Sequence, residues 1–536
     1  GSEMCIRDRG IKVGSVLRFQ TRKGLTFFVE TGKIKGACAT TAKGDRSMSE
    51  FPQYTEEQEK KQGAGKGARG AAKLGEEPVG KLLFRLSVPT IAAQLVNALY
   101  NIVDRMYIGH MEGSGKLALT AMGVCLSLIM IISAFAALTA MGGAARASIM
   151  LGKGDKKEAE RILGNCTIVT VIVGAVLTVV FVVFAEKLLW MFGADEDTIG
   201  YAVQYMRIYA FGTIFVELAL GLNAFITAQG FSLMGMLSVV IGAVVNIALD
   251  PLLIYGFSMG VRGAAIATVV SQTVSAVWVV GFLLSKKTIL RIRLKYFKVS
   301  WASYLPCVFL GASPFIMQFT ESVISICFNV SLLKYGGTLA VGAMTILYSV
   351  MQFAMLPLQG LTQGAQPIVS YNYGAGQRER VKKTFGILLR SCLIYSTALW
   401  ATCMLFPQLF AKMFTSDAEL GAYALTPLRV YMAMSLIFGA QIACQQTFIA
   451  LGKAGISFFL AVLRKVILLI PLIFILPHIF SADSTMAIFL AEPIADTLAV
   501  ATTVTTFGVL FSKYLKGGKA ERLPVGAEKT DFSEGN

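Results

Sequence analysis

The chain has 536 residues, of which 55% are hydrophobic and only 15% are charged. An average soluble domain carries about 25% charged residues, so the composition argues against a soluble protein. The formal charge of +17 comes without a basic folded domain, so nucleic-acid binding is not expected.

Residues 1–80 differ from the rest of the chain. They are polar, rich in Gly and Lys from Thr55 to Lys73, and contain no apolar segment of the signal-peptide type. We expect a disordered basic N-terminal tail here. The stretch before Met48 has no coherent periodicity, and we interpret it as non-native, with Met48 as the expected start.

Apolar runs of about 20 residues, long enough to cross a bilayer, recur from Leu82 to Phe511. They predict an all-α membrane protein with an N-terminal six-helix lobe at 81–290, a C-terminal six-helix lobe at 291–513 and a C-terminal tail at 514–536. The twelve predicted spans are 84–109, 118–143, 160–184, 199–227, 232–256, 263–284, 303–332, 340–366, 385–406, 424–450, 455–478 and 485–511.

The two halves repeat each other at a constant shift of 222 positions. Leu117-Ala118 recurs as Leu339-Ala340, Gly152-x-Gly154 as Gly374-x-Gly376, and Arg207-x-Tyr209 as Arg429-x-Tyr431. A single register held over this length indicates two pseudo-symmetric bundles. Related bundles that face each other are a common plan of membrane transporters.

Charged loops predict the orientation, because short loops rich in Lys and Arg stay on the cytoplasmic side. The even-numbered loops are basic, as in Lys153, Lys156, Lys157 and Arg161, whereas the odd-numbered loops carry acids such as Asp195, Glu196 and Asp197. We therefore expect a multi-pass protein of the inner or plasma membrane with both termini in the cytoplasm.

Ionisable groups inside membrane spans are costly, so each needs a partner or a function. The first span places four polar residues on one helical face, namely Gln94, Asn97, Asn101 and Asp104. Asn246 and Asp250 stack one turn apart in the fifth span, before Pro251, and Thr268 lies early in the sixth.

Helix rise places Asp104, Asp250 and Thr268 at the same depth, about five residues or roughly 8 Å from the outer ends of their spans. We predict that Asp104, Asn246, Asp250 and Thr268 form a coupling-ion site. Their oxygens suit Na⁺, and neighbouring acids that share a proton are the alternative. The structural alternatives are an interfacial pair between Asp104 and Arg105, and a polar anchor at Asp250 beside the proline.

The second half carries its own polar residues. We predict contacts with substrate from Glu321, Gln363 and Gln366, together with Gln94, Asn97 and Asn101 of the first span. Hydrogen bonding between helices is the structural alternative for the glutamines. Arg464 lies near the level of Asp496, and we expect a buried ion pair of Arg464 with Glu492 and Asp496; a proton-coupled switch is the alternative.

Several motifs resemble the MATE (multidrug and toxic compound extrusion) family of prokaryotic efflux transporters, within the MOP flippase superfamily. The resemblance covers about 78–512 and rests on Asn97-Ala98-Leu99-Tyr100-Asn101-Ile102-Val103-Asp104, Asn246-Ile247-Ala248-Leu249-Asp250-Pro251, Gln363-Gly364-x-Gln366-Pro367 and Glu492-Pro493-Ile494-Ala495-Asp496.

The resemblance implies alternating access by two six-helix lobes and a coupling cation at Asp104, Asn246, Asp250 and Thr268. Glu321 stands where some relatives hold an acid in the seventh span. Their partner acid in the tenth span has no equivalent, since that span offers Gln441 and Gln445 instead.

These patterns predict a cation-coupled antiporter that exports cationic amphiphilic drugs, using Na⁺ or H⁺ as the coupling ion and no cofactor. Its expected partners are small organic cations and the lipid bilayer, and we expect a monomer. A flippase for lipid-linked oligosaccharides or other lipids of the same superfamily is the alternative. An enzyme is not expected, because the two histidines, His110 and His478, lie at span ends and no nucleotide or metal motif appears.

Overall fold

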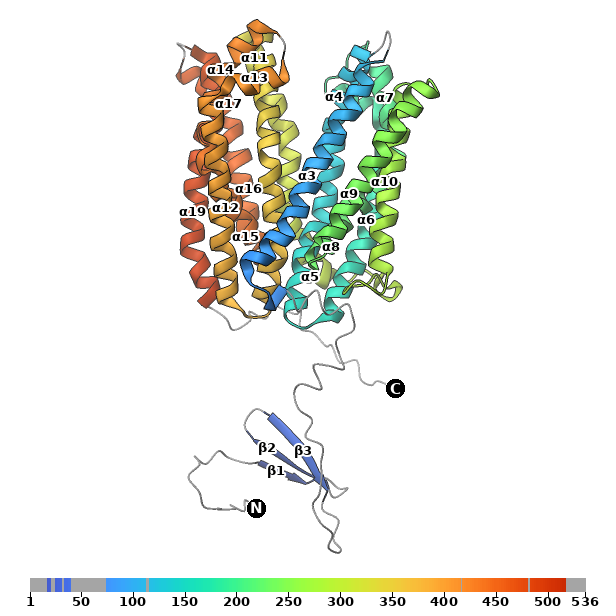
Figure 1. Ribbon diagram of the computed structural model, residues 1–536, viewed down its shortest axis with the longest axis vertical. Helices are drawn as coiled ribbons and strands as arrows, with labels where there is room; N and C mark the ends of the chain where they lie inside the picture. Colours follow the sequence, from blue (N-terminus) through green and yellow to red (C-terminus); the bar gives the residue numbers. More distant parts are fainter. Residues whose placement is uncertain are drawn as a thin grey trace, which may run out of the picture. The chain divides into compact units, whose positions relative to one another are not determined.

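Six membrane-spanning segments follow one another in each half of the chain. The structure, a computed structural model, describes residues 17–20, 25–30, 33–39, 74–111, 115–415, 417–480 and 483–516. The chain divides into two units, Gly1–Gly63 and Ala64–Asn536. The predicted all-helical fold is confirmed for the described residues of the second unit (Figure 1).

The described part of the first unit forms an antiparallel sheet of three strands, β1 (Leu17–Gln20), β2 (Leu25–Glu30) and β3 (Lys33–Ala39). We expected residues 1–80 to be disordered. Within this range the structure instead describes the three strands and, from Leu74 onward, helical residues. The other residues of the range lie outside the described ranges. The predicted tail at 514–536 also lies outside them beyond Lys516.

The first lobe contains the first six spans. In chain order these are α3 (Val79–Gly109); α4 (Gly115–Ala136) continued by the π-helix η1 (Ala137–Met141) and α5 (Gly142–Gly152); α6 (Lys156–Met191); α7 (Ile199–Phe211) with α8 (Thr213–Ala228); α9 (Ser232–Pro251) with the π-helix η2 (Leu252–Gly256); and α10 (Val261–Leu284).

The second lobe follows the short 3₁₀ helix η3 (Leu294–Tyr296). Its elements are α11 (Trp301–Gly374), α12 (Arg378–Leu405), α13 (Pro407–Phe414), α14 (Ala418–Tyr431), α15 (Ser435–Ala450), α16 (Ala454–Val462), the π-helix η4 (Leu463–Leu469), α17 (Ile470–Ile479), α18 (Ser484–Phe489) and α19 (Ala491–Lys516).

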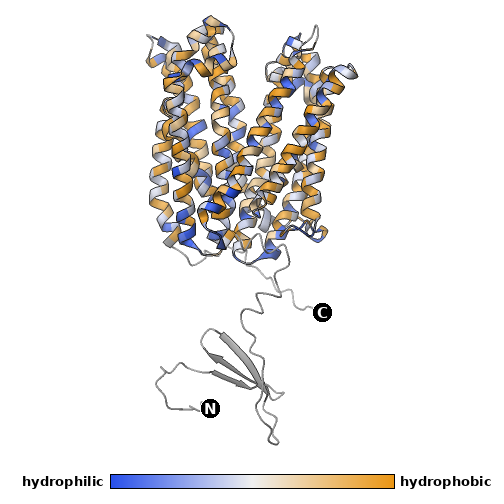
Figure 2. Ribbon diagram, in the orientation of Figure 1, coloured by the Kyte–Doolittle hydropathy of each residue, from blue (hydrophilic) through white to orange (hydrophobic). Residues whose placement is uncertain are grey.

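These segments account for the twelve predicted spans within the described residues. Nine continuous segments are long and apolar enough to cross a membrane, and the bent pairs α7–α8 and α14–α15 are two more. The helix α11 supplies a further span, because it joins two helices at Gly337, whose φ of +68° is readily adopted only by glycine. Figure 2 shows that hydrophobic residues predominate along the helices of both bundles.

The bends reproduce the sequence repeat in three dimensions. The α7–α8 pair is bent by 58° and the α14–α15 pair by 51°. The repeated Arg-x-Tyr motif, Arg207-x-Tyr209 and Arg429-x-Tyr431, directly precedes each bend, and both tyrosines are buried. The repeat therefore corresponds to equivalent broken helices in the two lobes.

We call the end that carries the basic loops the inner end and the opposite end the outer end. Figure 1 shows the two bundles converging at the inner end, where α5 and α8 lie, and separating toward α4 and α14. Glycines allow the close approach at the inner end. A β-carbon at Gly142 would collide with the backbone of Cys307 and Gly311, and one at Gly311 with the backbone of Leu138.

The loops at the outer end contain local hydrogen bonds that order them. In the loop between α6 and α7, the Asp195 carboxylate accepts bonds from the Thr198 hydroxyl at 2.5 Å and the Thr198 N–H at 2.9 Å. These bonds stabilise the charged carboxylate and so lower the pKa of Asp195. Asp417 and Asp483 likewise cap α14 and α18 by accepting from backbone N–H groups.

Candidate cation and substrate site

The first span, α3, connects the two lobes. Near its inner end, the Ser87 hydroxyl donates to the Leu361 carbonyl at 3.2 Å and the Thr90 hydroxyl to the Gly360 carbonyl at 2.5 Å, both in α11. Toward its outer end, α3 packs on α9 of the first lobe. A movement of α3 therefore affects the first-lobe site and the contact between lobes together.

The predicted acid pair lies at this α3–α9 contact. Asp104 of α3 is 7% exposed, whereas Asn246 and Asp250 of α9 are fully buried. The Asn246 side-chain amide donates to the Asp250 carboxylate at 3.3 Å, and the carboxyl groups of Asp104 and Asp250 lie within hydrogen-bonding reach of each other. The structure thus brings three of the four predicted coupling residues together.

Three oxygens of this cluster have no hydrogen-bond partner within the described residues. They are Oδ1 of Asp104, Oδ1 of Asn246 and Oδ2 of Asp250, and all are buried. Buried polar atoms are nearly always bonded, and two adjacent carboxylates repel each other unless a positive charge intervenes. The donor set of two carboxylates and one amide oxygen fits a hard cation or a shared proton.

The neighbouring Arg105 acts on Asp104 through its charge without a direct ion pair. No ion pair joins Asp104 and Arg105 in the part of the chain that the structure describes, and the Arg105 side chain is exposed. The interfacial pair between these two residues, the structural alternative for Asp104, is therefore not present in this state.

Thr268 is close to the pair but does not bond to either acid. It is 8% exposed, and its hydroxyl donates to the Ala264 carbonyl at 3.0 Å. The Tyr205 hydroxyl lies beside it and interacts electrostatically with Asp104. Tyr205 therefore provides the link between Thr268 and the pair.

Two further residues near the pair, Tyr100 and Gln272, were not predicted as site residues. Tyr100 interacts electrostatically with both acids and lies beside the side chains of Asn101 and Gln272. A signal for each is nevertheless present in the sequence, because Tyr100 precedes Asp104 by one helical turn and Gln272 follows Thr268 by one turn.

The predicted substrate residues occupy different positions around α3. The Gln94 amide donates to the Gln363 carbonyl oxygen of α11 at 3.1 Å, so this pair joins the lobes. The Asn101 amide donates to the Asn97 main-chain carbonyl at 2.6 Å, within α3. Gln366 is partly buried, one turn after Gln363 on α11.

The charged side chains in the interior of the second lobe form ion pairs with one another. Arg464 of η4 contacts Glu492 at 2.9 Å and Asp496 at 2.6 Å, and all three side chains are buried. Its guanidinium also lies 4.4 Å from the centre of the Phe438 ring. The adjacent Lys465 pairs with Glu321 at 2.7 Å, so Glu321 has a cationic partner in this state while its side chain is 36% exposed.

The tenth span contributes amides instead of acids to the second lobe. The Gln445 amide lies 3.3 Å from the Met317 sulfur, and the buried Gln441 side-chain oxygen has no hydrogen-bond partner among the residues that the structure describes. The second lobe therefore presents no acid pair like that of Asp104 and Asp250 among the described residues.

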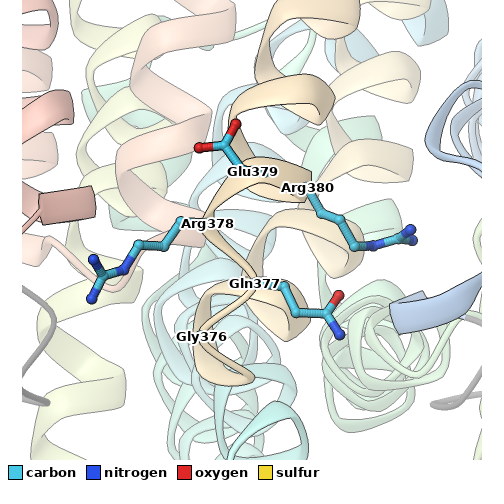
Figure 3. Close-up of a pocket in the computed structure, with 5 residues that line it drawn as sticks. All are labelled: Gly376, Gln377, Arg378, Glu379 and Arg380. Atoms are coloured by element: carbon cyan, nitrogen blue, oxygen red, sulfur yellow. The ribbon is translucent and has the colours of Figure 1, made fainter.

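A small surface pocket lies at the inner end, far along α11 from these groups. It is lined by the turn from Gly376 to Arg380, where Arg378 and Arg380 point in opposite directions (Figure 3). Arg380 donates to the carbonyls of Leu74 at 3.0 Å and Glu77 at 2.8 Å and thereby fixes the segment before α3. This pocket is an anchoring point rather than a cavity for substrate.

Two six-helix bundles related by a sequence repeat define the chain as a multi-pass membrane protein, and its fold is the one seen in solved structures of MATE transporters. The model of the family MatE matches residues 89–252 and again residues 314–475, once in each lobe. The chain belongs to this family, as the motifs of the first and fifth spans imply.

Similar proteins include bacterial exporters. The multidrug export protein MepA of Staphylococcus haemolyticus is 24% identical over 426 residues, which cover 79% of this chain and 93% of that protein. MepA of Staphylococcus saprophyticus is 24% identical over 460 residues, covering 85% and 97%.

Solved structures share the fold. A MATE transporter crystallised in the bent conformation has a TM-score of 0.78 at 22% identity, covering 84% of this chain and 99% of that chain. A MOP superfamily transporter from Pyrococcus furiosus, described as having a binding pocket of reverse polarity, has a TM-score of 0.76 at 22% identity, covering 83% and 98%.

Proposed function

We propose that this transporter exports small cationic amphiphilic compounds in exchange for Na⁺ or H⁺. The observation that carries the proposal is the buried pair of Asp104 and Asp250, which together with Asn246 has three oxygens without a hydrogen-bond partner in the described ranges. Membership of the MatE family and the similarity to staphylococcal multidrug export proteins support the export of more than one compound.

The acid pair explains why cation and substrate would alternate. Two adjacent carboxylates in a membrane interior are strongly destabilised until a cation or proton neutralises them. A neutralised pair lets α3 and α9 pack closely, whereas an ionised pair favours an arrangement with more water or a cationic substrate. A ligand shifts a conformational equilibrium only by its differential affinity for the two states.

The helix α3 would transmit this change to the lobes. Its outer half carries Asp104, and its inner half is bonded to α11 through Ser87 and Thr90. Pro89 lies between these two residues and removes one main-chain hydrogen bond, so the helix is easier to bend there. Binding at Asp104 would thus alter the contact that joins the lobes at the inner end.

The orientation follows from the basic loops of the inner end. We propose that this end and both termini face the cytoplasm, that the protein acts as a monomer, and that the lobes joined at the inner end correspond to an outward-facing state. A cationic substrate would then leave toward the outside after the pair takes up its ion.

Transport by purified protein in proteoliposomes tests the proposal. With an imposed Na⁺ or pH gradient, the wild type should move cationic dyes against their gradient, and Asp104→Asn should abolish this movement. Asp197→Asn removes an exposed loop carboxylate by the same chemical change and should transport normally. Equal transport by wild type and Asp104→Asn would contradict the role of the pair.

The same vesicles distinguish the alternative function. Lipid-linked oligosaccharides can be added to the membrane and their exposure on the far leaflet measured. Cation-dependent flipping without movement of dye would show a lipid flippase instead of a drug exporter.

A further inference from the structure

A second buried acid of the first lobe takes no part in the site described above. Glu217 lies in α8, its side chain is fully buried, and neither carboxyl oxygen has a hydrogen-bond partner among the described residues. A carboxylate without a partner is far less stable in a protein interior than in water, so such a group is stable there only with a proton. Glu217 thus has the environment of a proton carrier.

The bend between α7 and α8 fixes the depth of Glu217. Gly212, at the bend, lies so close to Val269 that an added β-carbon would be 2.6 Å from the Val269 Cγ2. Val269 directly follows Thr268, and Glu217 is one to two turns further along α8, roughly 8 Å nearer the inner end. The acid therefore lies between the Asp104–Asp250 pair and the inner end of the lobe.

Polar groups gather around Glu217 in an otherwise apolar interior. Thr213, one turn earlier on α8, also has a buried hydroxyl for which the described part of the chain offers no hydrogen-bond partner. On α6, a β-carbon added at Gly174 would be 3.6 Å from the Glu217 Cγ, and Thr170, one turn earlier, bonds to Thr139 at 3.1 Å. Thr139 belongs to the π-helix η1, and π-helical turns are frequent at functional sites.

Tyrosines lie within electrostatic range of Glu217 on both sides. Tyr209 of α7 interacts electrostatically with Glu217 and with Tyr100, which in turn interacts with Asp104 and Asp250. Toward the inner end, Tyr304, near the start of α11, interacts with Glu217. A phenol hydroxyl both donates and accepts hydrogen bonds, so these tyrosines suit the transfer of a proton.

No charged side chain neutralises Glu217 within the described residues. Tyr209 and Tyr304 interact with it electrostatically. The helices packed on α8 carry further charged residues for which no bond with Glu217 is found among the described residues, namely Lys116 in α4, Arg146 in α5, Lys156, Lys157, Glu158, Glu160, Arg161, Glu186 and Lys187 in α6, Arg207 in α7, Asp250 in α9, Arg262 in α10, and Glu321 and Lys334 in α11.

We propose that Glu217 is a second proton-binding group of the first lobe, which passes protons between the Asp104–Asp250 pair and the inner end. The inference deepens the proposed cation-coupled export and rests on it. We assign a proton and not a metal ion to Glu217, because one carboxylate with hydroxyl neighbours provides fewer oxygens than a metal cation requires.

The transfer makes and breaks only O–H bonds. With the lobes joined at the inner end, Glu217 carries a proton and is neutral. When the inner end opens, water accepts this proton and leaves a carboxylate. A proton of the Asp104–Asp250 pair then passes through the hydroxyls of Tyr100 and Tyr209 to Glu217, and the pair is ready for the next ion.

Infrared difference spectroscopy on the purified full-length protein tests the proton site without any transport. During a pH titration, the wild type should show the C=O stretch of a buried carboxylic acid, and Glu217→Gln should lose one component of it. Glu186→Gln, which removes an exposed carboxylate of α6, should retain the full band. A band unchanged in Glu217→Gln would overturn the proposal even if export itself is established.

A second measurement separates a proton carrier from a permanently protonated structural acid. In proteoliposomes with a pH gradient, Glu217→Gln should slow dye efflux by about tenfold or more while dye affinity stays within about twofold, because a neutral amide cannot exchange the proton. Glu217→Asp, which keeps a carboxyl, should retain part of the efflux and a shifted infrared band. Wild-type efflux by Glu217→Gln would overturn the proposal, whether or not the variant loses the infrared component.

Discussion

Gly152 and Gly374, which occupy equivalent positions in the two sequence repeats, lie against each other's helices where the two lobes meet. A β-carbon at Gly152 would collide with the main chain of Tyr371 and Ala375, and one at Gly374 with the main chain of Ile149. The repeated Gly-x-Gly motif therefore closes the inner end by a symmetric crossing of α5 and α11. Close main-chain contact therefore helps to hold together a position that must open during transport.

We predict that Gly152→Ala weakens this crossing. The added methyl group has no space, and overpacking of a tight contact costs about 1–3 kcal/mol. The population should shift toward separation of the lobes at the inner end, seen as longer spin-label distances between introduced cysteines at Lys156 and Lys382. Gly281→Ala in α10, where a β-carbon meets nothing within 4 Å, is the matched control. Unchanged distances in Gly152→Ala would show that the crossing does not hold this state.

The buried charges of the second lobe predict a stability effect. Arg464→Ala leaves Glu492 and Asp496 buried without their partner, which typically costs about 3–5 kcal/mol. Thermal unfolding of the purified protein should therefore begin at a clearly lower temperature. Arg85→Ala breaks an exposed pair with Glu77, worth about 0–1 kcal/mol, and should leave the unfolding temperature nearly unchanged. Equal effects of the two variants would contradict a structural role of Arg464.

Gln366 provides a test of the predicted substrate residues. A hydrogen bond to a charged ligand contributes about 1.5–3 kcal/mol, so Gln366→Ala should weaken the binding of a cationic dye by about tenfold or more. Fluorescence polarisation with purified protein measures this affinity. If Gln366 only joins helices, the affinity should stay within about threefold of the wild type, as expected for a bond of about 0.6 kcal/mol.

Periodicity and depth were sufficient to predict the spans and the proximity of Asp104 and Asp250. Asp104 and Asp250 each follow helical spacing from other polar residues, so their faces and levels could be derived before any contact was known. The broken helices could not be predicted in this way, since the residues at the bends, such as Gly212, also occur within straight spans. The three π-helices likewise had no signal in the apolar pattern.

Contacts between helices that are far apart in the chain could not be predicted from the sequence. The pairing of Lys465 with Glu321 depends on which faces of α11 and η4 meet. Tyr205 and Tyr100 were missed because tyrosines in apolar spans resemble ordinary core residues. Glu217 was missed because it is the one acid in the apolar run of α8, where Thr213, one turn earlier, is only a weak marker of a polar face.

The central claim is that the coupling ion and the exported cation oppose each other through Asp104 and Asp250. Binding of a cationic dye to the purified protein, measured across a series of Na⁺ concentrations and pH values, tests it most directly, because linkage between two ligands is reciprocal at equilibrium. We predict that added Na⁺ or lowered pH weakens dye binding to the wild type and has no such effect on Asp104→Asn or Asp250→Asn. The same dependence in the wild type and in both variants would contradict the claim.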